Sequence, residues 1–188
     1  WVTPLRWAFP RWADSIGKWH HARLSKPALR GWGGWYSLAE KVTAKDVLNQ
    51  VETVRRNPDH LRPDVMLIDK GHEVPGNFPE GLMPLASAAK GVGARPGLRL
   101  ELNGMSDPCV AIRKAVGQGF SYLKLGDMQP RGQYRDPKLT EFEMRRKLYA
   151  AVREAAGPDV YLLNSPRDLD RAAVGFVDAA RTGSTANR

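Results

Sequence analysis

Charged and polar side chains follow several apolar runs of this sequence, each at the point where the run ends. The segment 119–128, GFSYLKLGDM, carries Lys124 and Asp127 at its polar end. Other runs end at Asp69, Glu101, Asn164 and Arg181. Carboxylates placed together can attack a substrate or exchange protons with it, which is the chemistry such a cluster could perform. An ion-pair network is the competing interpretation, because such networks also gather at strand ends.

The segments that must position these residues alternate between short apolar runs and longer amphipathic runs. The apolar runs predict strands at 31–37, 63–71, 95–102, 120–127, 159–166 and 174–181. The amphipathic runs predict helices at 43–56, 81–92, 107–119 and 139–157, with Thr43 as an N-cap and a stop at Gly157 and Pro158. This alternation is typical of βαβ units and predicts an α/β fold with a parallel sheet.

Two parallel folds place chemistry at the carboxyl ends of their strands. A (β/α)₈ barrel does so at its rim, and a doubly wound sheet binds ligands beyond its strand ends. The sequence has no Gly-x-Gly-x-x-Gly after its first strand and no phosphate-binding loop ending in Gly-Lys-Ser/Thr. Nucleotide binding therefore has no support from a motif, and we expect no cofactor.

The amino-acid composition indicates which partners and which cellular location to expect. The 188 residues carry a formal charge of +9, but the basic residues are spread over helical segments, so we do not expect a nucleic-acid partner. Cys109 is the only cysteine, which excludes an intramolecular disulfide and fits a reducing, cytoplasmic location. No run approaches the ~20 apolar residues of a membrane span, so we expect no membrane partner.

Seven segments between Lys26 and about Arg181 resemble, in order, the catalytic barrel of glycoside hydrolase family 36, the α-galactosidase or melibiase group. They are GWGGWYSL, VTAKDVLNQVE, PDVMLIDKGHEVPGNFPEGLMPLA, GARPGLRLE, GFSYLKLGDM, REAAGPDVYLL and VGFVDAARTG. The resemblance implies a (β/α)₈ barrel that hydrolyses terminal α-galactosides with retention. A carbohydrate, an α-galactoside or a related sugar, is therefore the expected partner.

The resemblance also assigns sugar-binding residues. It gives Asp69, Lys124 and Arg181 to the sugar hydroxyls, although Lys70 stands where the family has a second aspartate. Trp35 and Trp32 lie at the first strand, where an aromatic ring could stack on the sugar. No metal is implied, since Asp69, His72 and Glu73 form only a weak metal-binding pattern.

The catalytic positions of the family are altered in this chain. Gly126 stands at the place of the nucleophile, and Asp127 is the next residue, which faces the other way unless a bulge turns it. Thr185 stands at the place of the acid/base group. Asp127 is the catalytic candidate, and Glu101 is the other nearby carboxyl group that could donate a proton.

Only six strands are legible, where a closed barrel has eight. We therefore expect a barrel truncated to about six strands over residues 31–188, preceded by an irregular lead-in at 1–30, rich in Trp and Arg, with a short helix near 11–24. The open edges would be covered by the lead-in or by a second copy in a homo-oligomer.

Three functions remain open from the sequence. The first is a retaining glycoside hydrolase with weak or absent activity. The second is a non-catalytic barrel, inactivated, redesigned or decayed, that binds carbohydrate weakly. The third, a nucleic-acid-binding protein, rests on net charge alone.

Overall fold

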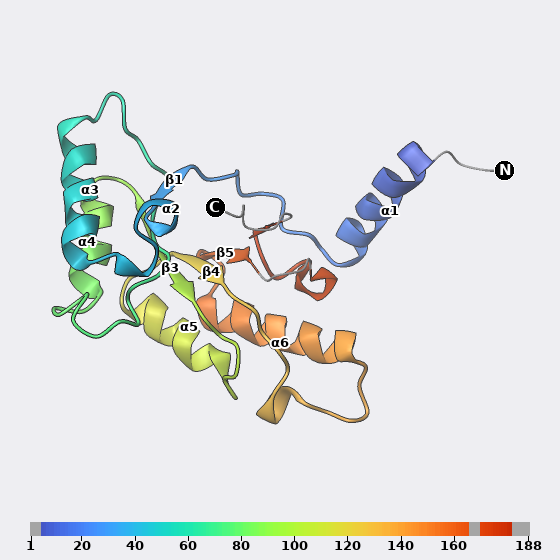
Figure 1. Ribbon diagram of the computed structural model, residues 1–188. Helices are drawn as coiled ribbons and strands as arrows, with labels where there is room; N and C mark the ends of the chain where they lie inside the picture. Colours follow the sequence, from blue (N-terminus) through green and yellow to red (C-terminus); the bar gives the residue numbers. More distant parts are fainter. Residues whose placement is uncertain (1–4, 166–169, 182–188) are drawn as a thin grey trace.

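The computed structural model describes residues 5–165 and 170–181 (Figure 1). The helices are α1 (Leu5–Trp19), α2 (Trp35–Leu38), α3 (Ala44–Arg56), α4 (Met83–Gly91), α5 (Pro108–Gly117) and α6 (Glu141–Ala156), with 3-10 turns at Ala39–Lys41, Gly132–Tyr134 and Arg171–Ala173. The strands are β1 (Gly31–Gly33), β2 (Val65–Ile68), β3 (Arg95–Leu100), β4 (Tyr122–Leu125), β5 (Tyr161–Asn164) and β6 (Ala179–Ala180).

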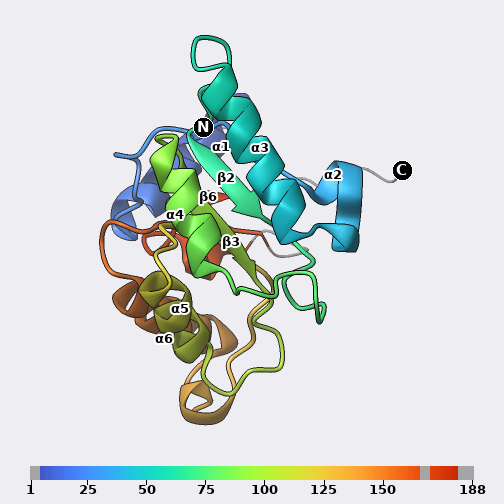
Figure 2. The ribbon, with the colours of Figure 1, turned by 90° about the vertical axis from the view of Figure 1, so that its left-hand side faces the viewer.

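The strands form one parallel sheet in the order β1-β2-β3-β4-β5-β6. Each strand pairs with the next one along the chain. The sheet curls into half of a barrel, and α3, α4, α5 and α6 cover its outer face (Figures 1 and 2). The predicted α/β fold with six barrel-type strands is thus confirmed, and we call this unit the half-barrel.

All six strands are shorter than predicted, and two of the differences have a local cause. The first ends at Gly33, and Trp35 opens α2 instead of continuing the strand. Gly34 allows this turn because a Cβ there would come within 2.7 Å of Val42. The last strand begins only at Ala179, since the Asp178 carboxylate accepts the hydrogen bond of the Leu162 N–H, at 2.9 Å.

Two helices begin at capping boxes. Thr43 accepts a hydrogen bond from the Asp46 N–H, and the Asp46 carboxylate accepts one from the Thr43 N–H. Thr140 and Glu143 form the same arrangement at the start of α6. Gly157 ends α6 with a φ of 80°, a conformation that favours glycine. The predicted N-cap and the predicted stop are both confirmed.

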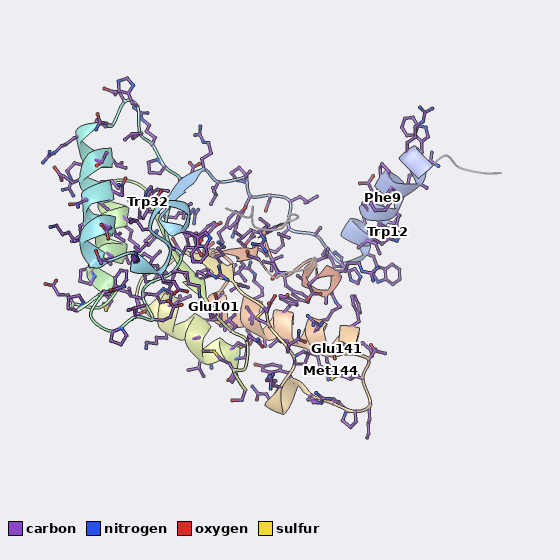
Figure 3. The ribbon with its side chains drawn as sticks, in the orientation of Figure 1. Phe9, Trp12, Trp32, Glu101, Glu141 and Met144 are labelled. Atoms are coloured by element: carbon purple, nitrogen blue, oxygen red, sulfur yellow. The ribbon has the colours of Figure 1, made fainter. Side chains whose placement is uncertain are left out.

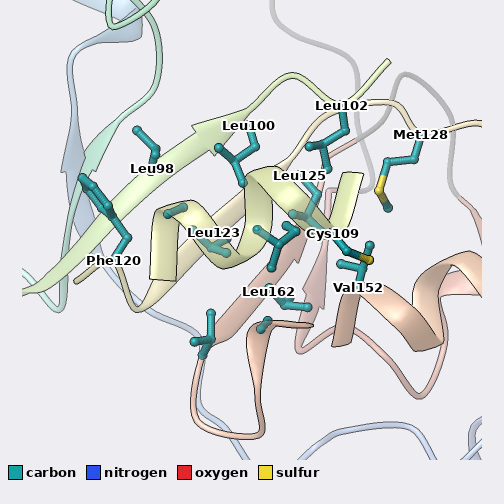
Figure 4. Close-up of a cluster of buried hydrophobic side chains, with 14 of the residues drawn as sticks. Leu98, Leu100, Leu102, Cys109, Phe120, Leu123, Leu125, Met128, Val152 and Leu162 are labelled. Carbon is teal, nitrogen blue, oxygen red and sulfur yellow. The ribbon is translucent and has the colours of Figure 1, made fainter. Parts of the chain in front are cut away.

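The main core lies between the sheet and its outer helices. Side chains from the outer face of β2 to β5 pack against α5 and α6, as Figure 4 shows for a cluster that includes Leu98, Leu123, Leu125, Cys109 and Val152. Burying an aliphatic side chain of this size contributes about 1.5–3 kcal/mol. This layer holds the strands in register and so fixes the positions of the polar residues at their ends.

A smaller apolar cluster fills the concave face. Val65, Tyr122 and Tyr161 are buried there, and the two tyrosine rings stack with centroids 5.3 Å apart. Burial, with the nearby Tyr161 and Asp69, raises the pKa of Tyr122 to about 12, so its hydroxyl stays neutral. Leu29 packs against this cluster from the segment before β1.

The N-terminal segment is more regular than predicted, because the helix expected near 11–24 begins earlier and ends earlier. A helix, α1, spans Leu5–Trp19, and Figures 1 and 3 show it projecting away from the sheet. Trp7, Phe9, Trp12 and Trp19 are all exposed on it. Phe9, Trp12, Ile16 and Trp19 recur at a helical spacing and so share one face of α1. This pattern was missed from the sequence, where further Trp, Arg and Pro residues interrupt it.

The buried carboxylate of Asp178 connects the segment that follows α1 to the sheet. This contact lies at the end of the sheet opposite the carboxyl ends of the strands. Asp178 Oδ1 lies 3.0 Å from Arg23 Nε and 3.4 Å from Lys26 Nζ, and Oδ2 lies 2.7 Å from Arg153 Nη2. Burial pushes the pKa of Asp178 upward, but the Leu162 N–H and the two arginines outweigh it and hold the pKa below its ordinary value. Asp178 thereby joins the lead-in, α6 and β5.

We expect Asp178→Asn to lower the free energy of unfolding by about 3 kcal/mol at pH 7, because it leaves three cations around a neutral group. The folded-state pKa is depressed, so the contribution is complete above the unfolded-state pKa and is lost as the pH falls through the folded-state pKa. The difference between variant and wild type should therefore shrink on acidification. Urea unfolding followed by far-ultraviolet circular dichroism measures both.

Asp59→Asn is the matched control, since the Asp59 side chain is highly exposed and lies 3.6 Å from Arg62, an exposed partner. It should leave the unfolding curve unchanged. An equal loss in both variants, or a difference that grows toward low pH, would contradict this account of Asp178.

Candidate functional site

The register of the sheet sets three charged residues on one level of the concave face. Ile68 pairs with Leu98, and Arg99 pairs with Lys124, so Asp69, directly after Ile68, lies level with both. Lys124 Nζ donates to Asp69 Oδ2 at 2.6 Å, and Arg99 Nη1 donates to Oδ1 at 3.3 Å. Both oxygens of this buried carboxylate are therefore satisfied by cations from neighbouring strands.

A second carboxylate extends the cluster. Glu101 Oε1 lies 2.7 Å from Arg99 Nη2 and 3.2 Å from Lys70 Nζ. Two carboxylates and three cations thus form one connected group, and we call Asp69, Lys70, Arg99, Glu101 and Lys124 the rim network. Its formal charge is the sum of three positive and two negative groups, or +1.

The rim network joins Asp69 and Lys124, two of the predicted site residues. It also brings in Glu101, another predicted site residue, whose place near the centre of the molecule is labelled in Figure 3. Arg99 joins all the parts and was missed from the sequence. The sequence does contain a pattern that could have identified Arg99. Every second residue of a strand points to the same face, so Arg99 shares a face with Gly97 and Glu101.

Gly126 lies directly beside this network. Its N–H donates to Leu100 O at 2.9 Å, so the β3–β4 pairing reaches this residue. A Cβ at Gly126 would lie 2.7 Å from Glu101 Oε2 and 3.1 Å from Leu100 O. The side-chain direction of residue 126 thus leads to Glu101, and a glycine there leaves room for the Glu101 carboxylate.

Other predicted site residues lie around this end of the sheet. Asp127 is exposed, directly after Gly126. Arg181 follows β6, and its N–H donates to Asn164 O at 2.9 Å. Trp35 lies in α2, after β1, and is partly buried. Thr185 lies outside the described residues.

His72 lies in the loop after β2. Its Nε2 is 3.5 Å from Glu73 Oε1, and burial lowers its pKa although Glu73 acts in the other direction. Among residues 5–165 and 170–181, no group of three or more His, Cys, Asp or Glu side chains could hold a metal ion. In the same part of the chain, no helix is long and apolar enough to cross a membrane.

Comparison with known proteins gives structural neighbours only. No family model and no curated protein matches the sequence. The α-galactosidase TtGalA from Thermus thermophilus, solved with p-nitrophenyl α-D-galactopyranoside, matches with a TM-score of 0.70 and 22% identity over 90% of this chain and 45% of its own. The GH36 α-galactosidase AgaA from Geobacillus stearothermophilus, solved with stachyose, matches with a TM-score of 0.62 and 12% identity over 90% of this chain and 33% of its own.

A third neighbour is the α-galactosidase MEL1 from Saccharomyces cerevisiae, with a TM-score of 0.57 and 13% identity over 88% of this chain and 40% of its own. The chain therefore spans less than half the length of these three enzymes. The likeness establishes the fold alone, a half-barrel that resembles part of each of these enzymes.

We expect Asp69 and Lys124 to be strongly coupled in stability, because each is largely buried and removal of one leaves the other charge unpaired. Asp69→Asn and Lys124→Met should each cost about 3 kcal/mol. The double variant should cost less than the sum of the two by at least about 1 kcal/mol. A double-mutant cycle from urea unfolding measures this difference.

The matched control is the Glu52 and Arg56 pair on α3, with a similar distance of 2.8 Å but exposed side chains. Its cycle should show no measurable coupling. Additive effects of Asp69 and Lys124 would mean that the rim contact does not hold in solution.

Proposed function

We propose that this chain binds an α-galactoside or a related sugar at the rim of the half-barrel and is a glycoside hydrolase of the α-galactosidase type with weak turnover. The observation that carries the proposal is the contact between Asp69 and Lys124 at the carboxyl ends of β2 and β4 in a barrel of the α-galactosidase fold. Chemistry in such barrels is placed at this end.

The charges of the rim network suit a neutral polyhydroxyl ligand. Each sugar hydroxyl both donates and accepts a hydrogen bond. Asp69 supplies acceptor oxygens, while Lys124 and Arg99 supply donors on the same level of the sheet. We assign Arg181 and Trp35 to the border of this sugar site, the first as a donor and the second as a stacking surface.

Weak turnover follows from the catalytic positions. Retention requires two carboxyl groups about 5–5.5 Å apart, one as nucleophile and one as acid/base. Gly126 supplies no carboxylate where the family resemblance places the nucleophile. Asp127 is the predicted substitute, yet it is exposed rather than set among the rim residues that are partly or fully buried.

A non-catalytic carbohydrate-binding barrel is the second candidate. The observation in its favour is that each rim carboxylate meets two cations. Asp69 meets Arg99 and Lys124 from the next two strands, and Glu101 meets Arg99 from β3 and Lys70 from the end of β2. A carboxylate with both oxygens held by cations, as in Asp69, is less available to attack a substrate. Turnover of an activated substrate separates this candidate from the first.

We expect methyl α-D-galactopyranoside to bind with millimolar affinity and 4-nitrophenyl α-D-galactopyranoside to be hydrolysed slowly. Lys124→Gln should weaken sugar binding about tenfold, the loss of about 1.4 kcal/mol from a charged hydrogen bond. Ligand-observed NMR titration measures the affinity, and release of nitrophenol measures turnover. Lys114→Gln, an exposed change on α5, should leave both unchanged.

Absence of sugar binding in the folded wild-type protein would contradict the proposed function. Rapid hydrolysis that disappears in Asp127→Asn would instead establish Asp127 as the nucleophile and contradict weak turnover.

We also propose, as the sequence predicts, that the chain associates with a second copy. Within the described residues β1 and β6 are the open edges of the sheet, and α1 presents exposed aromatic side chains beyond it. An exposed apolar face of this kind gains free energy when a partner covers it.

Multi-angle light scattering should therefore give a mass above the 20.9 kDa of one chain. The double variant Phe9→Gln/Trp12→Gln should shift the protein toward the mass of a single chain, because these two rings, 5.6 Å apart, lie on the exposed face of α1. Val110→Gln, which replaces an exposed apolar residue on α5, is the control and should leave the mass unchanged. A monomeric wild-type protein at all concentrations would rule out association.

A further inference from the structure

We propose that Glu101 is the catalytic nucleophile of the rim, supplied from β3 in place of a carboxylate on β4. This inference rests on the proposed function, since it names the group that performs the weak hydrolysis. It is carried by the placement of Glu101 against Gly126 and by the different surroundings of the two rim carboxylates.

The two carboxylates of the rim network differ in access. The Asp69 side chain is 6% exposed, and its two oxygens each accept from a cation. The Glu101 side chain is 38% exposed. Both cations that contact Glu101 are nearest to Oε1. A substrate can therefore reach Glu101, while Asp69 is committed to binding and to the network.

The second oxygen of Glu101 is aimed at the backbone of β4. Oε2 lies 2.7 Å from the point where a Cβ of residue 126 would stand. Because Leu100 pairs with Leu125, residues 101 and 126 share one level of the concave face. The Glu101 carboxylate thus occupies the space into which a side chain from the end of β4 would project.

Gly126 is what makes this placement possible. Any side chain at residue 126 would meet Glu101 Oε2 and Leu100 O at less than ordinary contact distances. Residue 126 itself places no side chain beside Oε2. Arg99 and Lys70 hold Oε1 and so fix the direction of the carboxylate.

The proposed step balances without any other reagent when the leaving group is activated. Oε2 forms a bond to the anomeric carbon, and the bond from that carbon to the aryl oxygen breaks, its electron pair leaving with the phenolate. Water then adds to the anomeric carbon and gives its proton to the solvent. The bond to Oε2 breaks in that step and regenerates the carboxylate.

The test uses 2,4-dinitrophenyl α-D-galactopyranoside, whose phenolate leaves without protonation. We expect Glu101→Gln to lower kcat by at least about a hundredfold, since it removes the negative charge needed for attack but keeps the shape of the side chain. Gly126→Ala keeps the carboxylate but displaces it, and should also lower kcat, by about tenfold or more. Glu154→Gln, an exposed change on α6, is the control and should leave kcat unchanged.

Rescue by azide separates a nucleophile from a structural role. In Glu101→Ala, azide can enter the vacated space and attack the anomeric carbon from the face opposite the leaving group. We expect sodium azide to restore turnover and to give β-galactosyl azide, identified by NMR. Thermal unfolding of each variant, followed by circular dichroism, checks that it is folded.

The outcomes distinguish this inference from the proposed function. Sugar binding without any wild-type turnover, or turnover that survives in folded Glu101→Gln, overturns the role of Glu101 and leaves sugar binding standing. Turnover lost in Asp127→Asn but kept in Glu101→Gln overturns it in favour of Asp127. Absence of both binding and turnover overturns the proposed function itself.

Discussion

The carboxylate of Asp69 is buried at the end of β2, and a buried charge requires partners. Its own strand supplies none, so the partners come from the next two strands, Arg99 from β3 and Lys124 from β4. The site therefore depends on the order and the register of three strands. The same requirement also explains why Arg99 matters, since the same guanidinium that serves Asp69 reaches Glu101. The rim is therefore one electrostatic unit and not a set of separate side chains.

The two ends of the sheet use charge in different ways. At the end away from the rim, Asp178 is fully buried between Arg23, Lys26 and Arg153, and its contacts are with segments that build the fold. At the rim, Lys70 and Glu101 remain partly exposed. Between the ends, the stacked Tyr122 and Tyr161 fill the concave face with apolar surface. The buried network serves stability, and the partly open one is where a ligand can exchange contacts with water and protein.

The sequence predicted the parts of this structure that follow from local patterns. Apolar runs marked the strands, capping residues marked the starts of helices, and polar residues after the runs marked Asp69, Glu101 and Lys124. It did not predict Arg99, because a charged residue within a strand is assigned to the site only when its neighbours across the sheet are known. It placed Trp35 in a strand, since the turn at Gly34 depends on Val42 from a later segment. The length of α1 was missed although its apolar residues recur at a helical spacing, because Pro10 and the neighbouring Trp and Arg residues interrupt that pattern.

Glu101 directly follows β3, yet its carboxylate lies beside Gly126 at the end of β4. Comparing the residues of β4 alone with those of another barrel therefore misses a carboxylate that the neighbouring strand supplies. Adjacent strands lie about 4.8 Å apart, so residues on one level of neighbouring strands serve the same region of space. A glutamate has one more methylene than an aspartate and can lean from its own strand over the next. When the neighbour on that level is glycine, no side chain opposes this lean, and Glu101 Oε2 comes to lie over Gly126. A carboxylate that is absent from β4 in the sequence is therefore still present in the space above β4.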